Sequence, residues 1–240
     1  MNKSLILIAA TAAASFAAPI QFGIEAKAGY NVLSLGSDLD AGVVAGSPES
    51  QPSFGAAIGP TFAYGLNEQF ALGGSVLFVY DLNRFDNTFD LGVLGSNKEE
   101  HTISQMSLGL QFAPVFHINE FFSVKFGYEW DMPFSGTSEN KRTTTLGSAS
   151  NTATDKSDIV WAPAKLSDVG TKEFPVLSTH NLILGGAYQI TPMVALTLQG
   201  KVGLTGSVPH YNASGDLDGA AGSGSNMRSH QIAVGMNLGL

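Results

Sequence analysis

Seven charged residues occur inside stretches where polar and apolar residues alternate, and their spacing limits the chemistry they can perform. Glu25 and Lys27 are two positions apart, as are Glu129 and Asp131. Residues two apart in a β-strand point to the same side. We therefore expect these side chains to meet in one enclosed space, where each charge needs a partner of opposite sign. The full set is Glu25, Lys27, Lys125, Glu129, Lys201, Asp81 and Asp131.

Two functions are open to such a set. It can be a structural core of salt bridges, which is the favoured interpretation, or a gated ion path in which the pairs exchange partners. Counting residues along the strands places Lys27, Glu129 and Lys201 at a similar depth. We expect Glu129 to contact Lys27, Lys201 or both, and Glu25 to lie within reach of Lys125.

Catalytic and metal-binding chemistry has weaker support. Ser178, His180 and Glu173 are close in sequence, but a Ser–His–Glu set requires convergence in space that spacing alone does not give. The sequences DLDAG at 38–42 and DLDG at 216–219 lack the full ligand pattern of a calcium loop. There is no cysteine. We expect no catalytic residue, no metal and no cofactor.

The elements that position these residues are eight stretches with apolar residues at every second position, which predict β-strands. Three similar segments, YGLNEQF at 64–70, FHINEFF at 116–122 and YQITPMV at 188–194, predict tight turns between strands. Long intervals at about 35–53, 84–101, 135–175 and 206–227 separate the other strands. Short turns at one end and long loops at the other are typical of a transmembrane β-barrel. The strands begin at or near Ile20, Phe54, Phe70, Ile103, Phe122, Val176 and Val194, and the last is SHQIAVGMNLGL.

The two faces of these strands differ in the way that a membrane barrel requires. Bulky apolar residues occupy one parity, whereas Gly, Ala, Ser and charged residues occupy the other. A water-soluble barrel would place its bulky residues inside. Aromatic residues near both strand ends predict two interfacial girdles, formed by Phe22, Tyr30, Tyr64, Phe70, Phe78, Tyr80, Phe116, Phe122, Tyr128, Trp130 and Tyr188.

Composition and the N-terminus agree with export to a membrane. Lys3, an apolar run from Leu5 to Ala14 and the small residues Ser15 and Ala17 predict a cleaved signal peptide at 1–17, with a barrel domain at 18–240. Charged residues make up only 13% of the chain, against about 25% in soluble domains. The net charge of −8 argues against nucleic acid as a partner. No stretch of the mature chain predicts a transmembrane helix.

The turn pattern, the four intervals and the alternating C-terminal strand resemble the eight-stranded outer-membrane barrels of Gram-negative bacteria, such as the OmpA membrane domain, the OmpX type and the opacity-like surface proteins. The resemblance implies an all-β, up-and-down antiparallel barrel that crosses the outer membrane eight times. It also implies contact with outer-membrane lipid and lipopolysaccharide, and insertion by the barrel-assembly machinery. Family members commonly end in an aromatic residue that this machinery reads, whereas this chain ends in Leu240.

The function expected is that of a non-enzymatic surface barrel whose loops meet a host or environmental ligand, in the manner of an adhesin or antigen. A narrow channel for ions or small apolar solutes is the first alternative, and a lipid-modifying enzyme is the second. The interval 135–175 leaves three possibilities open: it is mobile, it folds over the barrel mouth, or it contains a further pair of strands.

Overall fold

The computed structural model describes residues 20–35, 49–220 and 227–239. The expected signal peptide at 1–17, the DLDAG segment and Leu240 lie outside the described residues. None of the helices within these ranges is long and apolar enough to cross a membrane.

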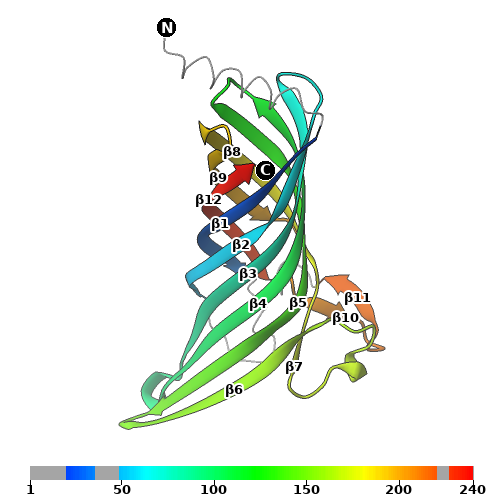
Figure 1. Cartoon of the computed structure of the whole chain (residues 1–240). Helices are drawn as coiled ribbons and strands as arrows, with labels where there is room; N and C mark the ends of the chain where they lie inside the picture. The colour runs from blue at the N-terminus through cyan, green and yellow to red at the C-terminus, as the bar shows by residue number, and fades with distance from the viewer. Residues whose placement is uncertain (1–19, 36–48, 221–226, 240) are drawn as a thin grey trace.

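Eight antiparallel strands form a closed ring (Figure 1), so the expected fold class is confirmed. Pairing of the first strand with the last, and of β4 with β5, closes the ring. A closed ring leaves no strand edge in lipid. In chain order the ring strands are β1 (Ile20–Leu35), β2 (Glu49–Gly65), β3 (Phe70–Asp90), β4 (Gly95–His117), β5 (Phe122–Leu146), β8 (Thr179–Thr191), β9 (Val194–Gly203) and β12 (Met227–Gly239).

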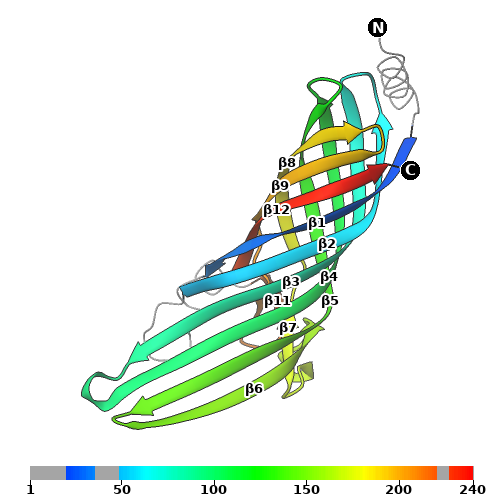
Figure 2. The same ribbon diagram turned by 60° about the vertical axis from the view of Figure 1, so that its left-hand side comes forward.

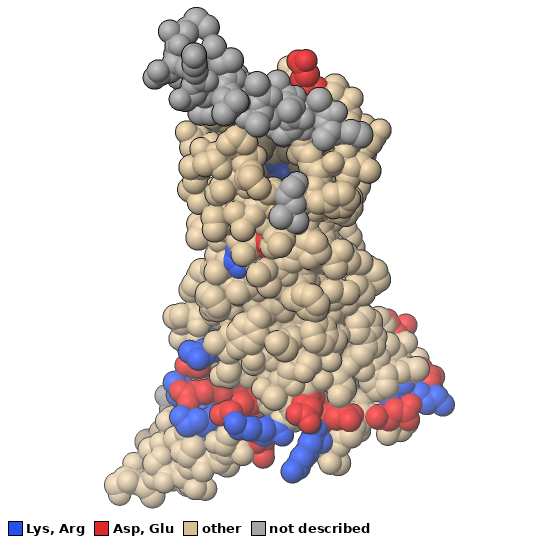
Figure 3. Space-filling view, in the orientation of Figure 1, with Lys and Arg blue, Asp and Glu red and all other residues tan. Residues whose placement is uncertain are grey.

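The alternation in sequence becomes an inside and an outside. Along β1, Glu25, Lys27 and Asn31 are buried, whereas Ile24 and Tyr30 are exposed. In the space-filling view the middle of the wall carries almost no charge (Figure 3), as a lipid-facing surface requires. Small residues are needed inside, since a Cβ on Gly55 would overlap the side chains of Gln231 and Asp81.

The repeated turn motif is explained by its asparagine. Asn67 Oδ1 accepts hydrogen bonds from the backbone N–H groups of Gln69 and Phe70, both at 2.9 Å. In the second turn Asn119 does the same for the N–H groups of Phe121 and Phe122, at 2.9 and 2.8 Å. In the third turn Thr191 replaces asparagine and pairs directly with Val194, which leaves a two-residue connection. Short turns therefore join three pairs of strands at one end of the barrel, called here the turn end.

For the interval 84–101 the expectation of a loop was wrong, because most of it is strand; much of the interval 135–175 is strand as well. β3 and β4 continue as paired strands as far as Asp90 and Gly95, joined by the short 3-10 helix η1 (Gly92–Leu94). β5 continues to Leu146 and pairs with β6 (Ala149–Trp161). Residues 84–101 and 135–158 thus form one sheet, called here the blade, which projects beyond the ring (Figure 2). Most residues of the blade are polar, although Phe89 is a buried apolar side chain, so the sequence shows no sustained apolar alternation there.

The remaining intervals contain small elements near the opposite end, the loop end. β7 (Glu173–Val176) runs parallel to the end of β6. The interval 135–175 therefore contains further strands, as one of the three possibilities stated. Between β6 and β7 lies the 3-10 helix η2 (Leu166–Asp168), and the last interval holds a hairpin of β10 (Pro209–Tyr211) and β11 (Leu217–Ala220).

We expect the refolded protein to migrate as a heat-modifiable band on electrophoresis. A closed antiparallel ladder has no free edge at which detergent can begin to open it, so the unheated protein stays compact. The measurement is migration in dodecyl sulfate with and without boiling, after refolding in mild detergent. Equal migration of the two samples would count against a closed barrel.

Candidate functional site

A buried charge network fills the middle of the lumen. Lys201 Nζ lies 3.0 Å from Glu129 Oε1 and 3.0 Å from Asp131 Oδ2. Lys27 Nζ lies 3.5 Å from Glu129 Oε2. The side chains of these four residues are at most 5% exposed. The structure thus brings Glu129 to both lysines named from the sequence, and it does so away from water, where such pairs resist separation.

Neutral amides complete the network, and these residues were not expected from the sequence. Gln111 donates a hydrogen bond to Glu129 Oε2. Asn181 donates to Asp131 Oδ2 at 3.0 Å. Nearer the loop end, Asn31 donates to Asp81 at 2.8 Å and accepts from Gln231 at 2.8 Å. The signal that could have found them is their parity, because each shares the inward parity of the charged residues on its strand.

Glu25 and Lys125 form a further pair on the turn side of this network, joined to it through Gln111. Lys125 Nζ lies 3.4 Å from Glu25 Oε1, and it also donates to Gln111 Oε1 at 3.4 Å. The Lys125 side chain is 20% exposed, whereas that of Glu25 is 2% exposed. All seven charged residues expected inside therefore point into the lumen, at three levels.

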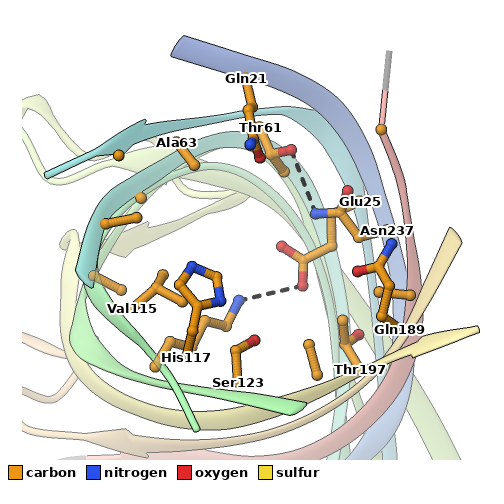
Figure 4. Close-up of a pocket in the computed structure, with 18 of the residues that line it drawn as sticks. Gln21, Glu25, Thr61, Ala63, Val115, His117, Ser123, Gln189, Thr197 and Asn237 are labelled. Atoms are coloured by element: carbon orange, nitrogen blue, oxygen red, sulfur yellow. Dashed lines mark hydrogen bonds and ion pairs between the residues drawn. The ribbon is translucent and has the colours of Figure 1, made fainter. Parts of the chain in front are cut away.

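A cavity of about 280 Å³, lined by both polar and apolar side chains, occupies the turn half of the lumen (Figure 4). Glu25 and Lys125 are among the residues that line it, and His117 projects into it (Figure 4). Its lining includes Asn67, Asn119 and Pro192 from the three turns, so the cavity opens at the turn end. Beyond the charge network the next space measures only about 30 Å³, room for about one or two water molecules.

An apolar cap closes the loop end. Leu33, Ile103 and Met227 project inward from β1, β4 and β12, and Ile159 of β6 and Val176 of β7 pack against them as one buried cluster. The interval 135–175 thus both contains strands and folds over the mouth. In the described residues the lumen is closed twice, by charges in the middle and by the cap at the loop end.

Several polar atoms of the interior have no hydrogen-bond partner among the described residues. They include Lys27 Nζ, Asp131 Oδ1 and both polar atoms of the Gln199 amide. In the described part of the chain, the 3.5 Å salt bridge to Glu129 is the contact that holds the Lys27 ammonium. Unsatisfied buried groups are costly, so the network has donors and acceptors left for a second arrangement.

The aromatic residues expected in girdles all lie on the outward parity of their strands. Most are exposed on the lipid-facing wall, whereas Tyr80 and Trp130 are half-buried. Tyr80 accepts a hydrogen bond from Ser104 at 3.1 Å. The exposed members are Phe22, Tyr30, Tyr64, Phe70, Phe78, Phe116, Phe122, Tyr128 and Tyr188.

The structure does not assemble the three residues considered for lipid-modifying chemistry. His180 Nδ1 contacts the hydroxyl of Tyr128, and its ring stacks on Trp130 with centroids 6.1 Å apart. Glu173 accepts a hydrogen bond from the backbone N–H of Gly170 at 2.7 Å. No contact among the described residues joins Ser178, His180 and Glu173, so the arrangement lacks the relay that activates a serine.

Comparison with known proteins gives structural neighbours only. No protein-family profile matches the sequence, and no curated relative does. Ail, the attachment invasion locus protein of Yersinia pestis, solved in complex with the heparin analogue sucrose octasulfate, is 11% identical; the match covers 93% of this chain and 100% of Ail, with a TM-score of 0.40. Neisserial surface protein A is 14% identical over 90% of this chain and 96% of that one, with a TM-score of 0.39. The toluene transporter TbuX of Ralstonia pickettii is 10% identical over 90% of this chain and 72% of its own, with a TM-score of 0.37.

The fold is that of an eight-stranded membrane β-barrel. This statement rests on the closed ring and the apolar wall of the chain itself. At these identities and scores the likeness to the three neighbours concerns general architecture.

Proposed function

We propose that the protein is a non-enzymatic barrel of the Gram-negative outer membrane that presents its blade and loop-end elements to the surroundings, as an adhesin or antigen does. The proposal rests on the contrast between the lumen and the blade. The lumen is closed by the charge network and by the apolar cap, whereas the blade is a large sheet that projects beyond the ring. A lumen filled by buried salt bridges and an apolar cap stabilises a scaffold. The blade is the part that water-borne partners can reach.

The orientation follows from the two ends. Short turns face the periplasm in this class of barrel and long connections face outward, so the turn end is periplasmic and the blade is extracellular. Removal of residues 1–17 as a signal peptide and insertion by the barrel-assembly machinery belong to the same proposal. The wall then contacts outer-membrane lipid and lipopolysaccharide through the apolar band and the aromatic residues.

The chemistry of the blade bears on its ligand. Ail is named with a sulfated heparin analogue, but this chain carries a net charge of −8, which opposes a polyanion. The charges of the blade are also engaged with each other, as in the pairs Lys141–Glu100 at 2.7 Å and Lys156–Glu139 at 2.8 Å. We therefore infer a partner that is not strongly anionic.

A shortened blade tests the proposal. Residues 86–100 and 139–156 are each replaced by Asn-Gly, which suits a two-residue hairpin; the flanking residues Phe85 and His101, and Ser138 and Ser157, are already paired across the strands. We expect cells producing this variant to lose protein-dependent adherence and binding of antibodies raised against the folded protein. Heat-modifiable migration should remain. Undiminished adherence and antibody binding would contradict a function carried by the blade.

A narrow channel is the second candidate, and one observation favours it. The unsatisfied atoms of Lys27, Asp131 and Gln199 permit a rearranged network, and the 280 Å³ cavity lies on its turn side. Partner exchange would then have to coincide with displacement of the cap for ions to pass.

A further inference from the structure

The far end of the blade exposes apolar side chains. Val93 is fully exposed, Leu94 is 66% exposed and Leu146 is 53% exposed, and Leu91 stands beside them. The two hairpin ends are adjacent because Gly95 pairs with Leu146. We call Leu91, Val93, Leu94 and Leu146 the tip.

The residue types of the tip are unusual for a hairpin turn. Hairpin turns favour Asn, Asp, Gly and Ser, which hydrogen-bond locally or tolerate positive φ. The neighbouring hairpin obeys this rule with Gly147 and Ser148, and Gly92 and Gly95 supply the positive φ values in the turn of the tip. Nothing in the turn geometry requires apolar residues at 93 and 94. A local rule broken without a structural gain points to a binding surface.

The tip is not a continuation of the lipid-facing wall. A charged belt lies between them: Lys98 Nζ is 3.0 Å from Asp86 and 2.9 Å from Glu100, and Lys141 Nζ is 2.7 Å from Glu100. In Figure 3 this belt crosses the molecule, and the blade beyond it is uncharged on the visible face. The membrane that surrounds the barrel therefore cannot also cover the tip.

Size and charge indicate what covers the tip. A stable protein interface uses about 20–30 residues on each side, far more than four side chains on the end of two hairpins supply. A fluid lipid phase, in contrast to a protein partner, can accept a few apolar side chains without a surface of complementary shape. In the sequence 89–97 and 143–154 Asp90 is the one charged residue, so nothing there attracts an anionic surface. Lys98 lies three strand positions from Gly95, the residue that follows η1; at ~3.4 Å per residue this separates the tip from the charged belt by about 10 Å, enough for the interfacial depth of about 5–10 Å.

We propose that the tip inserts into a second, zwitterionic lipid bilayer outside the cell, with the charged belt remaining in water. The proposal rests on the extracellular orientation given above. Leu91, Val93, Leu94 and Leu146 enter the headgroup region, and the Ser- and Thr-rich strands behind them lie at its surface. The blade then acts as a spacer that holds the two membranes a fixed distance apart.

Vesicle binding tests the proposal. The full barrel, held in amphipathic polymer, is mixed with phosphatidylcholine vesicles and separated by flotation. Compared with the parent protein, V93D/L94D should lower vesicle partitioning by on the order of 100-fold, because two buried apolar side chains become charges. Leu166→Asp is the matched control, since Leu166 is 52% exposed on η2 and should leave partitioning unchanged. All variants should keep heat-modifiable migration.

A second measurement reports insertion itself. The chain has no cysteine, so Val93→Cys and Leu166→Cys each give one site for an environment-sensitive dye. Dye at 93 should shift to the blue with vesicles and be quenched by brominated lipid, while dye at 166 should not.

Four results would overturn the proposal: no flotation of the parent protein, equal flotation of V93D/L94D, stronger binding on addition of phosphatidylglycerol, or a loss in V93D/L94D of self-association only. Failure of the proposed function is a separate outcome. It would appear as a blade that protease cannot reach on intact cells, whatever the vesicles show.

Discussion

Replacing Glu129 with alanine is expected to lower the free energy of unfolding by about 3–5 kcal/mol, the usual cost of removing one partner from a buried ion pair. Glu129 is the carboxylate shared by Lys27 and Lys201, and its side chain is 1% exposed. Lys201 keeps Asp131, but Lys27 loses its salt bridge. The measurement is denaturant unfolding in lipid vesicles, followed by tryptophan fluorescence and by the heat-modifiable band.

Glu139→Ala is the matched control. Glu139 also forms a salt bridge with a lysine, in which Lys156 Nζ lies 2.8 Å from Glu139 Oε2, but both side chains are at least 37% exposed. Exposed pairs contribute about 0–1 kcal/mol, so this variant should unfold almost as the parent does. Equal effects of the two substitutions would mean that water fills the middle of the lumen. New conductance in Glu129→Ala would support the same conclusion.

Arginine on the lipid-facing wall is expected to cost about 2–4 kcal/mol when it lies near the bilayer midplane. Phe126 is 58% exposed and Leu198 is 56% exposed on the lipid-facing wall, and neither belongs to an aromatic girdle. Phe126→Arg and Leu198→Arg should therefore each destabilise the barrel in vesicles. Ser148→Arg, at the turn of the blade, should change stability little because that residue is in water.

The outcome that contradicts this prediction is equal tolerance at the three positions. A one-residue error in strand parity exchanges every inward and outward side chain, so such a result would reject the assignment of faces. Retained stability of the wall variants in detergent alone would not, because detergent adapts to a charge more easily than a bilayer.

The ring was predictable from the sequence because each wall strand separates two different environments. Apolar residues such as Phe126 and Leu198 alternate with small or polar ones, and this period of two identifies both the strand and its faces. The pairing of Glu129 with Lys27 and Lys201 could be anticipated for the same reason, since parity and depth already place the three side chains together.

The blade and the cap could not be predicted in this way. Strands such as β6 have water on both faces: Thr152, Ala153 and Thr154 are all exposed, so no bulky apolar residue distinguishes one face from the other. The run of threonines at 143–145 is a weak sign of strand propensity. The cap depends on Ile159 and Val176 reaching Leu33 across the mouth, a long-range contact that local spacing does not encode. The amides Gln111 and Asn181 could have been named from parity, but nothing in the sequence selects them from other inward polar residues.

Planar-bilayer conductance of the refolded parent protein tests the central claim, a closed lumen, most directly. With the charge network and the apolar cap both in place, we predict no steady ion current at moderate voltage. A steady current in the parent protein that changes on Lys27→Met would contradict the claim, because it would place the ion path through the network itself.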